Sequence, residues 1–340
     1  LHDLVGIGIV RKLGFNLFQI SSAQTVQDML PGIAAATLQG CPGHGAHHSQ
    51  GQGEMVALLC HFSGLGIEIL KLETDLRRAV EREEIEVFYQ PIYSLKTGEI
   101  DCFESLARWD HPELGKIAPT KFIPLAEEIG LIDRLCEQVL RRACREIGSL
   151  QSRSTDLHKY SVSVNLSCRQ FSQNGLVKSI EDILAETGFS PTDLKLEITE
   201  SVLLVRTDRV RQTLAELSEI GVWLALDDFG TGFSALSYLS EFPFDMIKID
   251  RSFVEQLGAG QPEGSAITEA IINIGAALSL TTVAEAVGTE AQLHMLRDLG
   301  CQYCQGYLIS PPLPASGILE LLKDPARSYL PGSPPAIQSP

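Results

Sequence analysis

At 340 residues the chain has room for one large domain and an extension, and its 44% hydrophobic content is ample for a buried core. A formal charge of −16 at pH 7 argues against a nucleic-acid partner held by basic surface patches. No stretch has the length and purity of a membrane span, since the best candidate, residues 55–70, contains His61 and Glu68.

The two ends of the chain differ from its middle in composition and in hydrophobic periodicity. Residues 1–70 have weak periodicity and many Gly and Ala, so we leave them as an unassigned amino-terminal segment. From Leu72 onward the pattern becomes regular, and residues 73–84 predict a charged, amphipathic helix. We expect one domain over 71–325 and a disordered tail rich in Pro and Ser over 326–340.

The first two predicted strands lie close together in the sequence. Residues 86–92 and 100–109 are rich in β-branched and aromatic side chains, and a short turn separates them. Two parallel neighbours need a long crossover connection, for which this turn has too few residues. We therefore predict an antiparallel hairpin.

Strand-like and helix-like segments then alternate to the end of the domain. Further strands are predicted at 160–167, 193–201, 222–230, 245–250, 281–287 and 302–310. The helices between them are predicted at 121–130, 131–150, 177–188, 209–221, 235–242, 266–280 and 290–300. With the hairpin this makes eight strands, which predicts an α/β fold: a TIM-like (β/α)8 barrel whose first strand is antiparallel.

Each of the eight strand-like runs ends in polar residues, most of them acidic. In chain order these are Gln90, Glu104, Asn165, Glu197, Asp227 with Asp228, Lys248 with Asp250, Glu285 and Gln305. In a barrel the carboxyl ends of the strands meet at one rim, where these side chains would converge. Carboxylate and amide oxygens suit Mg²⁺ or Mn²⁺ better than zinc.

Taken singly, these residues have ordinary explanations. Glu104 is a plausible ion-pair partner of Arg108, Asp227 a helix cap, and Lys248 a surface lysine. These explanations do not account for the recurrence of polar residues at successive strand ends. The adjacent carboxylates of Asp227 and Asp228 also repel each other unless a cation neutralises them, which again favours a metal site.

Several motifs in order resemble one known family. They are YQPI (89–92), ESLARW (104–109), NLS (165–167), LEITES (196–201), DDFGTGFSALSYL (227–239), KID (248–250), AEAV (284–287) and QGYLIS (305–310). Across roughly residues 72–323 the chain resembles the EAL domains, which are cyclic di-GMP phosphodiesterases. The resemblance implies hydrolysis of cyclic di-GMP to the linear guanosine dinucleotide by a two-metal site holding Mg²⁺ or Mn²⁺, and we expect Ca²⁺ to inhibit.

The resemblance also implies a role for each residue of the rim. One metal would be bound by Glu104, Asn165, Glu197 and Asp227, and the second by Asp227, Asp228 and Glu285. The substrate would be contacted by Gln90, Leu106, Asp228 and Gln305, with Arg108 on a phosphate. Lys248 would hold or polarise the attacking water, with Glu285 beside it. Glu200 would brace the loop 229–234, which couples dimerisation to metal binding in the family, so we expect a homodimer.

Two departures from the family pattern leave alternatives open. Ser105 replaces alanine in the signature triplet, a small change that we expect to be harmless. Where the family has Glu-Gly-Val-Glu, this chain has Glu285, Ala286, Val287 and Gly288; if the family glycine needs a positive φ, Ala286 would strain the loop. The alternative functions are a weak or inactive cyclic di-GMP receptor and a protein-interaction scaffold.

The cysteines and residues 1–70 bear on the cellular location of the chain and on the protein it comes from. Its eight cysteines are scattered along the sequence, which is typical of a reduced protein and predicts a cytoplasmic location. Residues 1–70 lack a Gly-Gly-Asp-Glu-Phe motif, and they fit a remnant of an upstream sensor or GGDEF domain, a truncation or a reading-frame error.

Overall fold

The computed structural model describes residues 70–153, 160–172, 174–204, 208–230, 239, 241–258 and 262–323. The predictions for the amino-terminal segment, the tail and most of the helix at 235–242 lie outside these residues. The chain divides into two units, Leu1–Arg82 and Glu83–Pro340. In the first unit, residues 70–81 form a helix, which confirms most of the predicted charged helix.

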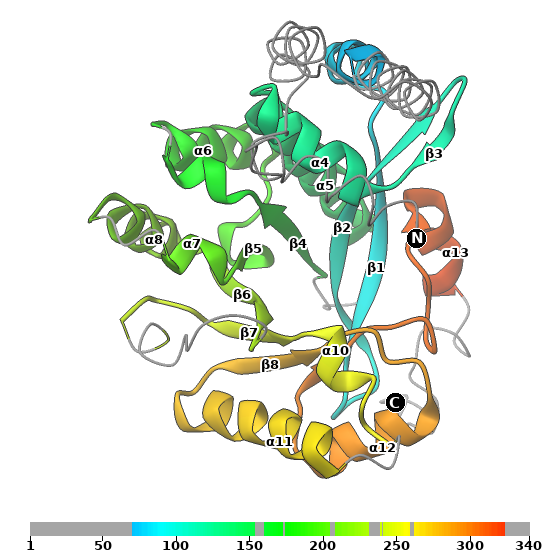
Figure 1. Ribbon diagram of the computed structural model, residues 1–340, viewed down its shortest axis with the longest axis vertical. Helices are drawn as coiled ribbons and strands as arrows, with labels where there is room; N and C mark the ends of the chain where they lie inside the picture. The colour runs from blue at the N-terminus through cyan, green and yellow to red at the C-terminus, as the bar shows by residue number, and fades with distance from the viewer. Residues whose placement is uncertain are drawn as a thin grey trace, which may run out of the picture. The chain divides into compact units, whose positions relative to one another are not determined.

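The second unit is built on a closed sheet (Figure 1). Its strands are β1 (Glu86–Ser94), β2 (Ile100–His111), β3 (Gly115–Ile117), β4 (Ser161–Leu166), β5 (Leu194–Thr199), β6 (Trp223–Phe229), β7 (Met246–Ile249), β8 (Thr281–Ala284), β9 (Tyr303–Cys304) and β10 (Leu313–Pro314). In the described residues their order is β10-β1-β9-β8-β7-β6-β5-β4-β2-β3, and an additional β1–β2 pairing closes the barrel. The predicted barrel of eight strands is therefore confirmed, with β3 and β10 as unpredicted additions at its side.

The first strand is reversed, as the short turn predicts. β1 pairs antiparallel with β2 from Glu86 opposite Arg108 to Tyr93 opposite Ile100. It also pairs antiparallel with β9, whereas β2 and β4 to β9 run parallel to one another. Because of this reversal, the beginning of β1 lies beside the carboxyl end of β2.

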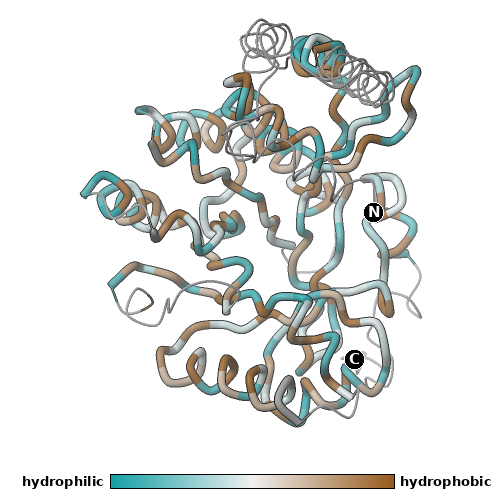
Figure 2. The backbone as a smooth tube through the Cα atoms, in the orientation of Figure 1, coloured by the Kyte–Doolittle hydropathy of each residue, from teal (hydrophilic) through white to brown (hydrophobic). Residues whose placement is uncertain are grey.

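Helices surround the strands of this unit (Figure 1). They are α4 (Pro119–Glu128), α5 (Ile132–Arg153), α6 (Leu176–Thr187), α7 (Ser201–Leu204), α8 (Asp208–Ile220), α10 (Arg251–Val254), α11 (Pro262–Ala277), α12 (Glu290–Asp298) and α13 (Ala315–Lys323), with short 3-10 turns η2 (Cys168–Ser172) and η3 (Pro191–Asp193). Polar and apolar residues alternate along α5, α6 and α8 (Figure 2), as expected of helices that pack one face on a sheet. No helix in the described part of the chain is long and apolar enough to cross a membrane.

A small apolar layer lies inside the barrel below the polar rim. Its buried members are Ile92, Cys102, Ala225, Met246 and Val283, with Tyr303 packed against them. Side chains two positions apart in a strand share a face. The residues two positions further along these strands are Glu104, Asp227, Lys248, Glu285 and Gln305, and Gln90 precedes Ile92 on the reversed strand. Because side chains two positions apart share a face, the polar rim residues lie directly next to the apolar layer on the inner face of the barrel.

The last predicted strand is shorter than expected. The pattern over 302–310 predicts one long strand, but β9 contains only Tyr303 and Cys304. Beyond Cys304 the chain leaves the sheet and hydrogen bonds with the loop that follows β8, because Val287 N donates to Gln305 O at 3.0 Å. The loss of the strand therefore reflects a tertiary contact that periodicity does not reveal.

Candidate functional site

The ammonium of Lys248 lies at the centre of the rim carboxylates. Its Nζ is 2.6 Å from Glu285 Oε1, 2.8 Å from Glu197 Oε2, 3.4 Å from Asp227 Oδ1 and 3.7 Å from Glu104 Oε1. The Lys248 side chain is 1% exposed. Residues from β2, β5, β6, β7 and the end of β8 therefore meet at one buried point, as their positions at successive strand ends predict.

Neutral donors hold the two innermost glutamates in place. Glu104 accepts hydrogen bonds from Asn165 Nδ2 at 3.0 Å and from Gln305 Nε2 at 2.6 Å. Glu197 accepts one from the hydroxyl of Ser163. Sequence reasoning missed Ser163, although it lies two residues before Asn165 on the same face of β4, and that spacing is the signal that would have identified it.

The paired aspartates reach one place because the backbone bends between them. The register between β6 and β7 shifts between Leu226 and Phe229, and Asp228 has a φ of 54°. Aspartate tolerates this left-handed conformation better than most residues with a side chain. As a result, carboxylate oxygens of Asp227, Asp228 and Glu285 lie within 4.8 Å of one another.

Burial and mutual repulsion perturb the protonation of the cluster. Burial raises the pKa of Glu285 to about 8, with repulsion from Asp227 and Glu104 adding to it against the attraction of Lys248. Burial and repulsion from Glu104 also raise the pKa of Glu197 well above its usual value. For Lys248, burial lowers the pKa, but the surrounding carboxylates outweigh burial and raise it well above its usual value. The lysine is therefore charged, and without a bound cation the cluster favours the protonated forms of Glu197 and Glu285.

The donor set fits divalent metal ions. Four carboxylates contact the Lys248 ammonium, and the exposed carboxylate of Asp228 lies beside Asp227 and Glu285, so four negative charges are uncompensated if bound cations keep all five carboxylates ionised. Two divalent cations carry four positive charges. Oxygen-only donors are the ligands that Mg²⁺ and Mn²⁺ prefer. The residues could hold such ions, which would offset the repulsion among ionised carboxylates.

Half-buried residues of β1 and β2 lie beside the carboxylates. The guanidinium carbon of Arg108 lies 5.8 Å from the centre of the Phe88 ring, a cation–π distance. Leu106, two residues before Arg108, is half-buried. Gln90 Nε2 donates to Ser310 O at 3.1 Å, so it ties β1 to the segment after β9. Gln90, Leu106 and Arg108 thus lie along one edge of the rim, whereas the predicted substrate residue Asp228 lies on β6.

Glu200 is buried just after the end of β5, and it is not among the four carboxylates that contact Lys248. Within the described part of the chain neither of its carboxylate oxygens has a hydrogen-bond partner. Most of the loop 229–234 that it is predicted to brace, namely residues 231–234, lies outside the described residues. Its bracing role stays a prediction.

The altered loop after β8 has the strain that the sequence comparison suggests. Ala286 has a φ of 53°, a left-handed conformation that costs free energy for a residue with a Cβ. Gly288 differs, because a Cβ added there would meet nothing closer than 3.7 Å, at Gln292 Oε1. The chain therefore has a strained alanine at 286 and space for a side chain at 288.

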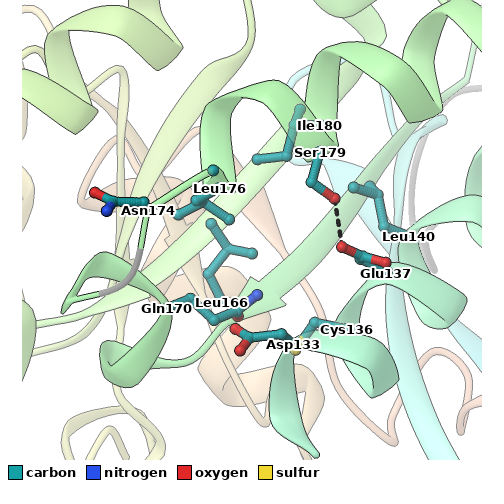
Figure 3. A pocket seen from close by; sticks show the side chains of 11 residues that line it. Asp133, Cys136, Glu137, Leu140, Leu166, Gln170, Asn174, Leu176, Ser179 and Ile180 are labelled. Carbon is teal, nitrogen blue, oxygen red and sulfur yellow. Dashed lines mark hydrogen bonds between the residues drawn. The ribbon is translucent and has the colours of Figure 1, made fainter.

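A separate cavity of about 140 Å³ lies between α5, η2 and α6. Asp133, Cys136 and Glu137 point into it from α5, and Ser179 of α6 donates a hydrogen bond to Glu137 (Figure 3). None of the rim carboxylates lines it. Ligand pockets usually exceed roughly 300 Å³, so this cavity is too small for a nucleotide and the rim remains the candidate site.

Comparison with known proteins gives one family. The profile of the EAL domain matches residues 73–312. The cyclic di-GMP phosphodiesterase NbdA of Pseudomonas aeruginosa is 40% identical over 270 residues, which are 79% of this chain and 34% of NbdA. The bifunctional diguanylate cyclase/cyclic di-GMP phosphodiesterase MucR of the same species is 42% identical over 253 residues, 74% of this chain and 36% of MucR. The chain thus spans about a third of the length of these relatives.

Solved structures of EAL proteins also match this chain. The PaMucR phosphodiesterase in complex with c-di-GMP has a TM-score of 0.69 and 41% identity, and the match covers 73% of this chain and 99% of that one. The EAL enzyme Bd1971, bound to cAMP and cyclic-di-GMP, has a TM-score of 0.71 and 30% identity, with 80% and 75% covered. Both of these structures contain cyclic di-GMP.

Proposed function

This chain belongs to the EAL domain family, and we propose that it hydrolyses cyclic di-GMP to the linear guanosine dinucleotide with divalent metal ions. The observation that carries the proposal is the group of four carboxylates around Lys248, from Glu104, Glu197, Asp227 and Glu285. A module that only binds nucleotide has no need of so many carboxylates held this close together.

The metal ions would be Mg²⁺ or Mn²⁺. Glu104, Asn165, Glu197 and Asp227 would hold one, and Asp227, Asp228 and Glu285 the other. When bound, such ions polarise a phosphodiester and lower the pKa of a bound water. Ca²⁺ should inhibit, because it prefers longer bonds and a looser geometry.

The protein's own groups would orient the reactants. Lys248 is charged and buried, so it would donate hydrogen bonds to the attacking water rather than remove its proton. Arg108 would bind a phosphate oxygen, and the Phe88 ring beside it limits the freedom of the guanidinium. Gln90, Leu106 and Gln305 would line the groove, with Asp228 near both metal and substrate.

A cyclic di-GMP receptor with little or no turnover is the second candidate. The specific observation in its favour is the strained loop, because Ala286 at a φ of 53° sits next to the proposed ligand Glu285. A poorly held second metal would leave nucleotide binding intact and slow the chemistry.

One assay separates the two candidates. The protein is incubated with cyclic di-GMP and Mg²⁺ or Mn²⁺, while calorimetry measures binding and chromatography measures the linear dinucleotide. Product formation that EDTA abolishes supports the phosphodiesterase. Binding without product supports the receptor, and the absence of both contradicts each proposal.

We also propose that the chain forms a homodimer in the cytoplasm and that its parent protein carries an upstream sensor or GGDEF domain. The dimer face would lie near residues 227–232, and Glu200 would brace the loop there. Light scattering tests this arrangement, since a fully active monomer would contradict it.

A further inference from the structure

Two chain segments cross at very close range beside the carboxylate cluster. A Cβ added to Gly306 would lie 2.1 Å from the carbonyl oxygen of Val287 and 2.2 Å from its nitrogen. Both neighbours are backbone atoms, which cannot rotate away as a flexible side chain can. Glycine is therefore the residue that this crossing permits.

Hydrogen bonds join the two segments on both sides of the crossing. Val287 N donates to Gln305 O at 3.0 Å, and Leu308 N donates to Val287 O at 3.1 Å. Gln305 N donates to Ala284 O at 2.9 Å. The peptide groups of Val287 are thus bound to residues before and after Gly306, so neither segment can shift without the other.

Each segment supplies one side chain to the rim. Glu285, two residues before Val287, contacts Lys248 at 2.6 Å. Gln305, immediately before Gly306, donates to Glu104 at 2.6 Å. A displacement at the crossing would therefore reach both sides of the carboxylate cluster.

The same segment also reaches the edge of the groove. Ser310 N donates to Gly306 O at 3.1 Å, and Ser310 O accepts the hydrogen bond of Gln90 at 3.1 Å. One continuous set of contacts thus runs from Glu285 through Val287 and the segment 305–310 to Gln90.

We propose that Gly306 is a positioning residue, whose backbone contact with Val287 holds Glu285 against Lys248 and Gln305 against Glu104 as one unit. Its importance for catalysis rests on the function proposed above, whereas the coupling of the two segments does not. The crossing would compensate for the strained Ala286 by fixing the loop from its far side.

The first test needs no metal. Hydrogen exchange of the full chain in EDTA is measured for Gly306→Ala and for the matched control Gly288→Ala, where an added Cβ meets only ordinary contacts. Gly306→Ala should lose protection over both 284–288 and 305–310, while the control keeps it. Loss confined to 305–310, or no loss, would overturn the coupling.

The second test measures Mn²⁺ binding by calorimetry. Gly306→Ala should weaken Mn²⁺ binding by about 10- to 100-fold, the usual effect of losing a supporting contact around a metal site. In a Glu285→Ala background its effect should shrink, because it acts through Glu285. An equal effect in both backgrounds would indicate general damage and would overturn the positioning role.

Two further outcomes keep the conclusions separate. If the unsubstituted chain binds no Mn²⁺, the proposed function is contradicted. The exchange experiment would still decide whether the two segments are coupled. If Gly306→Ala does not fold, an ester in place of the Val287 amide removes its hydrogen bond to Gln305 without a clash. That variant should lose protection over the same two segments, and retained protection would overturn the proposal.

Discussion

Lys248 Nζ lies 2.6 Å from Glu285 Oε1 in a site where the lysine side chain is 1% exposed. The contact joins β7 to the end of β8 and makes Glu285 depend on the lysine for charge compensation. Because three other carboxylates surround the same ammonium, Lys248 contributes to stability as well as to chemistry.

Replacing Lys248 by methionine should therefore separate its two roles. In EDTA the variant should lose about 3–5 kcal/mol of unfolding free energy, since the buried carboxylates lose their partner. Mn²⁺ should restore part of this loss, while hydrolysis stays low. Denaturant unfolding with and without Mn²⁺ measures both, with exposed Lys116→Met as the control. A stability loss that Mn²⁺ leaves unchanged would contradict this account of the cluster.

Glu104→Ala and Asp227→Ala each remove a proposed metal ligand. Activity should fall by about two to four orders of magnitude, because metal stabilisation of a transition state is worth several kcal/mol. The fold should survive, since neither side chain belongs to the apolar layer of the barrel. Steady-state hydrolysis and circular dichroism test this, with exposed Glu219→Ala as control. Near-normal hydrolysis by either variant would show that the site is wrongly assigned.

Activity should require Mg²⁺ or Mn²⁺ and should be inhibited by Ca²⁺. The reason is the oxygen-only ligand set, in which the larger ion favours a looser geometry. Hydrolysis is measured in EDTA, then with each ion alone, and then with Ca²⁺ added to the Mg²⁺ reaction. Full turnover in excess EDTA would rule out a metal mechanism.

Ala286→Gly combined with Gly288→Glu should raise both metal affinity and stability. A left-handed backbone costs a residue with a Cβ about 1–2 kcal/mol. The greater unfolded-state entropy of glycine cancels about 0.4–1 kcal/mol of the relief. Metal titrations of hydrolysis and thermal unfolding measure the two gains for the single and double variants.

Ser279 supplies the matched control for that strain, because its φ of 58° is also left-handed and it lies outside the cluster. Ser279→Gly should increase stability and leave metal affinity unchanged. Superimposable metal titrations for the parent and the double variant would mean that the departure at 286 and 288 is neutral.

A second buried lysine lies towards the opposite end of the barrel. Lys195 Nζ donates to Asp101 at 3.0 Å and lies 5.7 Å from the Trp223 ring and 5.8 Å from that of Tyr303. Asp101→Asn should lower the free energy of unfolding by about 1.5–3 kcal/mol, the usual contribution of a hydrogen bond to a charged group. Lys195→Met should lower it by less, since this substitution removes the buried charge that needs compensation. Urea unfolding tests the order, and the reverse order would contradict it.

Much of the fold follows from local pattern. The short turn before Ile100 excludes a parallel crossover, and the alternation of strands and helices predicts the barrel, both of which are confirmed. The positions of Glu104, Asp227 and Lys248 at strand ends also predict that these side chains converge at one rim. The sequence pattern did not predict β3, β10 or the early end of β9, because short pairings and crossings depend on residues distant in the chain.

The amino-acid sequence by itself determined which side chains gather at the rim, because strand periodicity and barrel closure leave them one common end. Only the tertiary structure decided how they meet: Lys248 among four carboxylates, Ser163 on Glu197, and Gly306 against the backbone of Val287. Periodicity specifies the face of a strand but not the distances between strands. Those distances come from the register of eight paired strands and from loops that pack on one another, and they make a row of polar strand ends into a charged, buried site.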